Sequence, residues 1–159
     1  MADFVKFHFD NTFYDKPITF SPFNIVQVGD IDTFSGYKCV RHTQVAHELT
    51  YIVRGNATML CDDKTYSCKT GDLIFNPKGT AHAIDSADGH SLRYYYIAFD
   101  IIDKSGQCEQ KLYEFFNTIK AGCATADRSI PHTFHDIFLN LYGKDEFSSV
   151  IVADSIRKL

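Results

Sequence analysis

The stretch HELTYIVRGNATMLCDDKTYSCKTGDLIFNPKGTAHAI, residues 47–84, decides the fold of this chain. Short runs rich in β-branched and aromatic residues alternate in it with turn residues at 55–56, 62–64 and 76–79. Short strands at this regular spacing are typical of an antiparallel sandwich or barrel. We therefore expect a series of antiparallel strands over this stretch, joined by tight turns.

The same pattern extends outward over about residues 25–102 and then changes. Beyond residue 105 the apolar residues recur at the i, i+3, i+4, i+7 spacing of an amphipathic helix. Gly122 and Gly143 follow the two apolar sets, at places where glycine commonly ends a helix. The sets are Leu112, Phe115, Phe116 and Ile119, and Phe134, Ile137, Phe138 and Leu141.

A third helix is predicted to begin at an Asp145 cap and to carry Phe147, Val150 and Ile151 on one face. The fold class expected from these patterns is mostly β with C-terminal α, an antiparallel β-barrel followed by two to three amphipathic helices. The apolar faces of the last helices have two uses that the sequence leaves open. They either pack against the barrel or form a symmetric dimer contact.

Length and charge limit the classes of function. The 159 residues suffice for one domain, and 45% hydrophobic with 23% charged residues is ordinary for a globular protein. A net charge of -4 repels phosphate, so we do not expect these residues to bind DNA by themselves. No apolar run approaches the roughly 20 residues that span a bilayer, and the first 16 residues do not resemble a signal peptide. The five cysteines form no CxxC pair, and we expect a cytoplasmic protein with reduced thiols.

Two groups of residues have the spacings G-x5-H-x-Q-x3-E-x6-G and G-x5-P-x-G-x2-H. These spacings resemble the two motifs of the cupin superfamily, with Gln44 at the second histidine and Ser86 at the final asparagine. The resemblance implies a cupin-type antiparallel β-barrel of the jelly-roll kind. The matching residues are Gly36, His42, Glu48 and Gly55 in the first motif and Gly71, Pro77, Gly79 and His82 in the second.

The resemblance implies that the metal-ligand positions of catalytic cupins fall on His42, Gln44, Glu48 and His82. Imidazole nitrogens, a carboxylate and an amide oxygen suit a divalent metal such as Zn, Ni, Fe or Mn. The alternative left open is a hydrogen-bonded polar cluster in the lumen, for which no metal is required. His47 has the opposite strand parity from Glu48, so we expect it on the outside of the barrel.

The opening stretch, the following YYYIAFD run (94–100) and the amphipathic helices together resemble the N-terminal cupin ligand-sensing and dimerisation domain of AraC-type transcription regulators. The resemblance covers roughly residues 20–159. It implies an N-terminal arm with the first strands over 1–23, a cupin β-barrel over 24–104, and a helical dimerisation or linker segment over 107–159. It also implies a homodimer through the C-terminal helices, and DNA binding only through a helix-turn-helix domain that these 159 residues do not contain.

The family resemblance also implies where a small-molecule effector, such as a carbohydrate, would bind. Alternation along the strand puts Tyr94 and Tyr96 on the lumen face, and aromatic faces suit a sugar. The alternative left open is that these tyrosines fill the barrel. Val40 stands nearest the position of the arginine that grips sugar in a family member, which counts against arabinose itself. The predicted ligand-binding residues are His42, Gln44, Glu48, His82, Ile84, Tyr94 and Tyr96.

Residues 1–23 contain more aromatic residues than a solvated tail would. They therefore favour an arm that covers the lumen. The predicted function is a small-molecule sensor in a transcription regulator, without enzymatic activity. The alternative is a metal-dependent cupin enzyme, an isomerase or a dioxygenase, that uses the four metal-ligand positions. The aromatic residues of the arm are Phe4, Phe7, Phe9, Phe13, Tyr14, Phe20 and Phe23.

Overall fold

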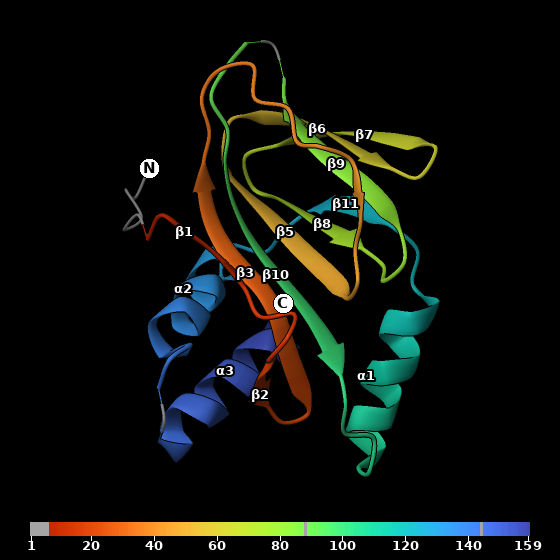
Figure 1. The fold of residues 1–159 in the computed structure, drawn as a ribbon, viewed down its shortest axis with the longest axis vertical. Coiled ribbons are helices and arrows are strands. Elements are labelled where there is room, and N and C mark those ends of the chain that lie inside the picture. Colours follow the sequence, from red (N-terminus) through yellow and green to blue (C-terminus); the bar gives the residue numbers. More distant parts are fainter. Residues whose placement is uncertain (1–6, 88, 144) are drawn as a thin grey trace.

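The structure, a computed structural model, describes residues 7–87, 89–143 and 145–159. Its strands are β1 (Phe9–Thr12), β2 (Ile18–Phe20), β3 (Phe23–Asp32), β4 (His42–Thr43), β5 (His47–Arg54), β6 (Asn56–Cys61), β7 (Lys64–Lys69), β8 (Asp72–Asn76), β9 (Ala81–Ser86), β10 (Arg93–Ile101) and β11 (Gly122–Thr125). Its helices are α1 (Gln107–Thr118), α2 (Ile130–Asn140) and α3 (Glu146–Lys158) (Figure 1). No helix in this part of the chain is long and apolar enough to cross a membrane.

The strands form two antiparallel sheets that face each other. The larger sheet has the order β1-β3-β10-β5-β8-β11, with β2 also paired to β3, and the smaller has the order β4-β9-β6-β7. The prediction of a mostly β fold with C-terminal helices is confirmed. The two sheets share no strand ladder over the described residues, so they form an open sandwich that is compatible with the predicted jelly roll and do not close into a barrel.

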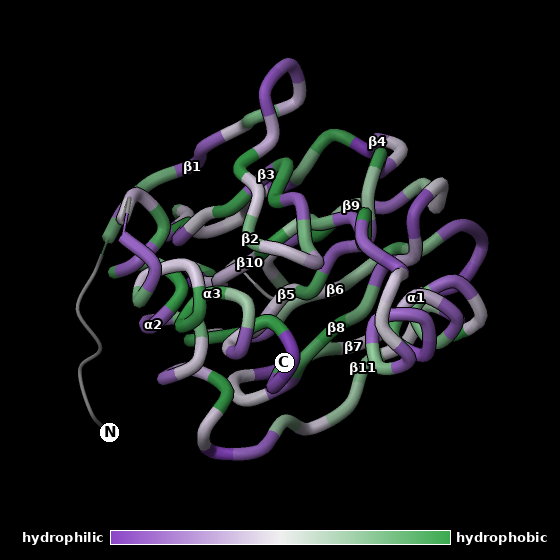
Figure 2. Tube along the Cα trace, turned by 90° about the horizontal axis from the view of Figure 1, so that it is seen from below, coloured by the Kyte–Doolittle hydropathy of each residue, from purple (hydrophilic) through white to green (hydrophobic). Residues whose placement is uncertain are grey.

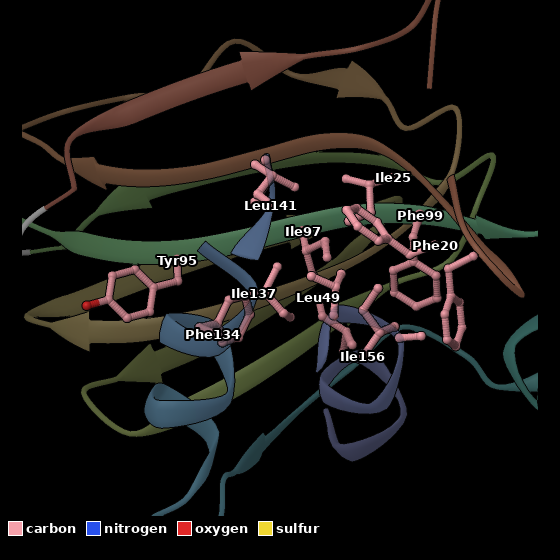
Figure 3. Close-up of a cluster of buried hydrophobic side chains, with 14 of the residues drawn as sticks. Phe20, Ile25, Leu49, Tyr95, Ile97, Phe99, Phe134, Ile137, Leu141 and Ile156 are labelled. Carbon is pink, nitrogen blue, oxygen red and sulfur yellow. The ribbon is translucent and has the colours of Figure 1, made fainter. Parts of the chain in front are cut away.

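The main core lies between the larger sheet and the helices. Tyr95, Ile97 and Phe99 point from β10 to this side, and Figure 3 shows them beside Phe134 of α2 and Ile156 of α3. All five side chains are buried. Helices α2 and α3 pack side by side, whereas α1 lies apart from them on the other side of the C-terminus (Figures 1 and 2).

A second core lies between the two sheets. Tyr94 and Tyr96 point into it from β10 and meet Met59 of β6 and Ile84 of β9. Strand β10 is therefore covered on both faces, and residues 93–99 are all buried. The predicted alternation of faces along this strand is what positions the two tyrosines in the lumen.

The two apolar sets that predicted helices are used differently. The set on α2 is buried, as expected of a packed face. On α1 only Phe116 is buried, while Phe115 and Ile119 are 53% and 36% exposed, because they line an open groove beside the sheet. The chain then forms β11, which pairs with β8 and which the sequence analysis did not predict. Its four residues are too few and too small to show a strand pattern.

Helix α3 begins where predicted, with Asp145 capping its first turn. The face predicted to be apolar points to solvent, since Phe147 and Val150 are 81% and 66% exposed. Val152 and Ile156, on another face, are the residues that pack into the core. Of the two uses left open for the predicted face, packing against the sheet is therefore excluded.

Candidate functional site

A cavity of about 170 Å³ lies in the lumen between the two sheets. Its volume is below the roughly 300–1,000 Å³ of pockets for drug-sized molecules, so it suits a small ligand. Strands of both sheets and the loop before β4 supply its walls. The lining residues are Asp10, Gln27, Tyr37, Cys39, His42, Glu48, Thr50, His82, Ile84, Tyr94 and Tyr96.

Tyr96 reaches across β3 to the first strand. Its hydroxyl donates a hydrogen bond to the Asp10 carboxylate on β1. Gly29 is the β3 residue paired with Tyr96, and a Cβ atom there would overlap the tyrosine ring. The missing side chain of Gly29 thus lets the ring lie over β3, and β1 borders the cavity through Asp10.

Glu48 is buried at the floor of the cavity, and its carboxylate accepts hydrogen bonds on both oxygens. Oε1 accepts from the Thr50 hydroxyl at 2.9 Å and from the Asn76 amide at 3.2 Å. Oε2 accepts from Nε2 of Gln44 at 2.6 Å. Burial alone would raise the pKa of Glu48, but the hydrogen bonds it accepts, the one from His82 foremost, hold that pKa below its usual range. Glu48 is therefore a buried negative charge.

His82 lies beside this carboxylate, with Nε2 at 3.4 Å from Oε1 of Glu48. Burial lowers the pKa of His82, but the neighbouring Glu48 carboxylate outweighs burial and raises it above 6.5. The other ring nitrogen, Nδ1, is buried and has no well-formed hydrogen bond to a described residue. The centroids of the His42 and His82 rings lie 4.5 Å apart. His42 is exposed and stands at the mouth of the cavity. The floor is thus a buried ion pair.

The four positions predicted as metal ligands do not form a ready ligand set. Gln44 turns its amide nitrogen toward Glu48, and its oxygen accepts a hydrogen bond from the Val45 N–H at 2.9 Å. Nδ1 of His42 lies 3.0 Å from the Val40 carbonyl oxygen. Over residues 7–87, 89–143 and 145–159, no group of three or more His, Cys, Asp or Glu side chains could hold a metal ion. The bonding fits the alternative of a polar cluster, and a metal here stays a prediction.

Six of the seven predicted ligand-binding residues line the cavity, and Gln44 lies behind Glu48. Thr50 was missed although it stands two positions from Glu48 on the same strand face. Asp10 could not be found from spacing, because only the pairing of β1 with β3 brings it there. Phe4, predicted as part of the arm, lies outside the described residues. The other lining residues that were missed are Gln27, Tyr37 and Cys39.

His47 lies outside the lumen, as its parity predicts, but it is not at the surface. Helix α1 covers this part of the sheet, and the imidazole packs between the rings of Phe75, Phe99 and Phe116. Its Nδ1 accepts a hydrogen bond from the Lys78 N–H at 3.3 Å. Burial lowers the pKa of His47. It is therefore a neutral core histidine, separate from the cavity.

The first strand joins the cavity to helix α2. The rings of Phe7 and Phe9 lie 5.4 Å and 5.0 Å from that of Phe138 on α2. Asp10 follows Phe9 and, by strand alternation, points to the opposite face, where it contacts Tyr96. One short strand thus touches the cavity with one face and helix α2 with the other.

A buried ion pair anchors the start of this strand. Arg93 donates from Nε and Nη2 to the two carboxylate oxygens of Asp30, at 2.9 Å and 2.8 Å. Oδ2 of Asp30 also accepts from the Phe7 N–H at 2.7 Å. Arg93 further donates to the Tyr95 hydroxyl, which lies 3.1 Å from Nε2 of His135 on α2. The arm, the centre of the larger sheet and α2 therefore share one polar network.

The chain is similar to known proteins in sequence and in fold. The family model described as AraC-like ligand binding domain matches residues 24–155. The structure of ToxT from Vibrio cholerae O395 superposes with a TM-score of 0.56 at 10% identity, over 85% of this chain and 54% of that chain, which shows a shared fold. The cupin domain of Cnp3 from Schizosaccharomyces pombe gives a TM-score of 0.44 at 13% identity, over 59% of this chain and 72% of that one. Oxalate decarboxylase from Bacillus subtilis gives a TM-score of 0.44 at 18% identity, over 50% of this chain and 25% of that one. No curated protein matches the chain.

Proposed function

The chain belongs to the family of AraC-like ligand binding domains, and we propose that its lumen binds a small carbohydrate whose presence regulates DNA binding by a helix-turn-helix module of the same polypeptide. One observation carries this proposal. The lumen holds a small cavity that is lined by tyrosines and carboxylates and bordered by the strand that contacts α2.

The chemistry of the lining suits a sugar. The rings of Tyr94 and Tyr96, with centroids 6.2 Å apart, offer aromatic faces to the C–H side of a sugar ring. The side chains of Asp10, Gln27 and Tyr37 offer hydrogen-bond partners for its hydroxyls. A volume of about 170 Å³ limits the ligand to a molecule as small as a monosaccharide.

The polar floor takes part in this proposal without a metal. His82 and Glu48 both line the cavity, and as an ion pair they offer charged hydrogen-bond partners to ligand hydroxyls. A metal-dependent enzyme would require Gln44 to turn its amide around and Glu48 to give up hydrogen bonds that it now accepts. We therefore propose a binding role for this floor and no catalytic one.

Binding would be transmitted through β1. A ligand that contacts Asp10 or Tyr96 changes how firmly β1 is held against the larger sheet. Phe7 and Phe9 carry that change to Phe138 of α2. Regulation of this kind needs a coupling free energy of about 1–3 kcal/mol, which one or two hydrogen bonds can supply.

The exposed face of α3 supports a homodimer. Phe147, Val150 and Ile151 are 81%, 66% and 39% exposed and stand at i, i+3 and i+4, so they form one apolar stripe. A two-fold axis would bury the same stripe of both copies. The net charge of -4 agrees with DNA contacts made by another part of the polypeptide, and such a regulator would act in the cytoplasm.

A calorimetric titration with a panel of neutral pentoses and hexoses tests the proposed ligand class. We expect at least one sugar to bind the wild-type protein. Tyr96→Phe keeps the ring but removes a cavity hydroxyl, and should weaken binding about three- to tenfold. The matched control is Tyr66→Phe, whose lost hydroxyl bonds the Ala121 carbonyl outside the lumen and should leave the affinity unchanged.

Two results would count against the proposal. One is that no sugar of the panel binds at millimolar concentration. The other is that Tyr66→Phe weakens binding as much as Tyr96→Phe, because the loss would then not arise in the lumen.

A further inference from the structure

A second cavity lies on the opposite face of the larger sheet from the lumen. It measures about 420 Å³, within the range of small-molecule pockets. It is bordered by α1, β11 and the end of α3, and we call it the α1 groove. Its lining consists of Leu49, Leu73, Phe75, Leu112, Phe115, Phe116, Ile119, Lys120, Gly122, Cys123, Ala124, Thr125, Ala126, Ile156, Arg157 and Leu159.

The walls of the α1 groove are apolar and incompletely covered. Phe115 is 53% exposed and Ile119 is 36% exposed, although both belong to the apolar stripe that makes α1 amphipathic. Across the groove stand Ile156 and Leu159 from the end of α3. Covering the exposed apolar side chains of a concave surface with a hydrocarbon group is favourable. It lowers the free energy by about 25 cal/mol per Å² of apolar surface buried.

The charged side chains that line the α1 groove are all of one sign. Its lining contains no Asp or Glu and two cations, Lys120 and Arg157, in a chain whose net charge is -4. Arg157 lies 3.5 Å from the Glu109 carboxylate. Lys120 has no ion pair with any described residue. The lysine end of the groove is therefore the place for a negative charge.

We propose that the α1 groove is a second ligand site, and that it binds an amphipathic monocarboxylate of the medium-chain fatty-acid class. The carboxylate pairs with Lys120. The hydrocarbon chain lies along Phe115 and Leu112 toward Ile156. Glu109, at the Arg157 end, disfavours the reverse orientation.

The α1 groove is separate from the lumen. Leu49, Phe75 and Phe116 belong to the core under the helices, whereas the lumen residues Tyr94 and Tyr96 belong to the core between the sheets. Figure 2 shows the C-terminus between α1 and the α2–α3 pair. Residues of α1 and of the end of α3 both line the groove. A ligand there touches α1 and the last turn of α3 together, so the site can be occupied whether or not the lumen is.

Calorimetric titration with sodium decanoate tests the proposal directly. We expect saturable binding with a dissociation constant on the order of 10–100 µM, as expected for a ligand of this size. Decylammonium has the same chain with the opposite charge and should bind at least about tenfold more weakly.

Variants locate the binding. Lys120→Gln should weaken decanoate binding about three- to tenfold, whereas Lys111→Gln, at an exposed lysine of α1 outside the groove, should leave it unchanged. Phe115→Ser should weaken it without unfolding the protein, because that side chain is already half exposed. Tyr96→Phe changes only the lumen and should leave decanoate binding intact.

Several outcomes overturn the proposal. Equal binding of decanoate and decylammonium, or equal effects of the two lysine variants, would remove the role of Lys120. Loss of decanoate binding in Tyr96→Phe alone would move the ligand into the lumen. Absence of decanoate binding, together with weaker self-association of Phe115→Ser, would assign the groove to a second copy of the chain.

Discussion

Replacing Glu48 by glutamine would put an N–H donor where every neighbour is also a donor. The carboxylate now accepts hydrogen bonds from Thr50, Asn76 and Gln44. The new amide nitrogen would face one of them and stay unpaired. We expect Glu48→Gln to lower the free energy of unfolding by about 1–3 kcal/mol, measured by urea denaturation. Glu114→Gln, at an exposed glutamate, should change it by less than about 0.5 kcal/mol, and equal effects would contradict this account.

The ion pair of Glu48 and His82 makes the free energy of unfolding depend on pH in a direction that can be predicted. Although burial lowers the pKa of His82, Glu48 raises it above 6.5 in the folded state, so its stabilisation is full below pH 6.5 and is lost as the pH rises through the raised pKa. The pKa of Glu48 is lowered below 4.5, so its contribution is lost as the pH falls through that lowered value.

The difference in free energy of unfolding between wild type and Glu48→Gln should therefore be largest from pH 4.5 to 6.5. Urea denaturation over a pH series measures it. His47 and His135 have lowered pKa values, which act in the opposite direction, but both variants contain them and their effects cancel in the difference. A difference that stays flat or grows above pH 6.5 would show that His82 is not held protonated by Glu48.

Strand parity explains why spacing could predict Glu48, His82 and the lumen tyrosines, since motif positions fix which face of a strand each residue occupies. The rotamer of Gln44 could not be predicted, because its amide orientation depends on the hydrogen-bond partners around it. Asp10 could not be predicted either. It enters the cavity through the pairing of Asp10 with Gly29, and no local pattern encodes that contact.

Two valines of helix α3, one buried and one exposed, can test which face of the helix packs against the core. Val152 is fully buried and Val150 is 66% exposed. Val152→Ala should lower the free energy of unfolding by about 1.5–3 kcal/mol, because it removes buried methyl groups and leaves a cavity. Val150→Ala should change it by less than about 0.5 kcal/mol. Chemical denaturation of both variants measures this, and a larger loss for Val150→Ala would mean that the faces are assigned wrongly.

Periodicity located all three helices and gave the packed face of α2, but it did not give the buried residues of α1 and α3. Helix α3 has apolar residues on two faces, so the position of the sheet, and not the pattern, selects Val152 and Ile156. Helix α1 has a clear stripe, yet only Phe116 is buried, because the helix leaves a groove beside the sheet. Strand β11 is held by pairing with β8, which a four-residue pattern does not reveal.

The exposed apolar stripe of α3 predicts that the protein self-associates. Sedimentation velocity should show a dimer of the wild-type protein at micromolar concentration. Phe147→Ser removes the most exposed side chain of the stripe and should raise the dimer dissociation constant at least about tenfold. Phe34→Ser, at a phenylalanine that is 72% exposed in the loop before β4, is the control and should have no effect. A monomeric wild type would rule out this dimer.

A hydrogen-bond network connects the arm, the larger sheet and helix α2. The mostly β fold, the helices after it and the family were predictable because each rests on local periodicity or fixed spacing. The network that joins Asp30 and Arg93 to Phe7 and His135 was not, because it spans residues more than 100 positions apart in the sequence. Contacts also run from Tyr96 in the lumen to Asp10 of β1, and from Phe9 of the same strand to Phe138 of α2.

Amide hydrogen exchange, measured with and without a saturating concentration of the sugar that binds best, tests whether a ligand in the lumen changes the stability of β1 and α2. We predict slower exchange in β1, β10 and α2, and unchanged exchange in α1. Slower exchange confined to α1 and β11, or none in β1 and α2, would contradict this prediction.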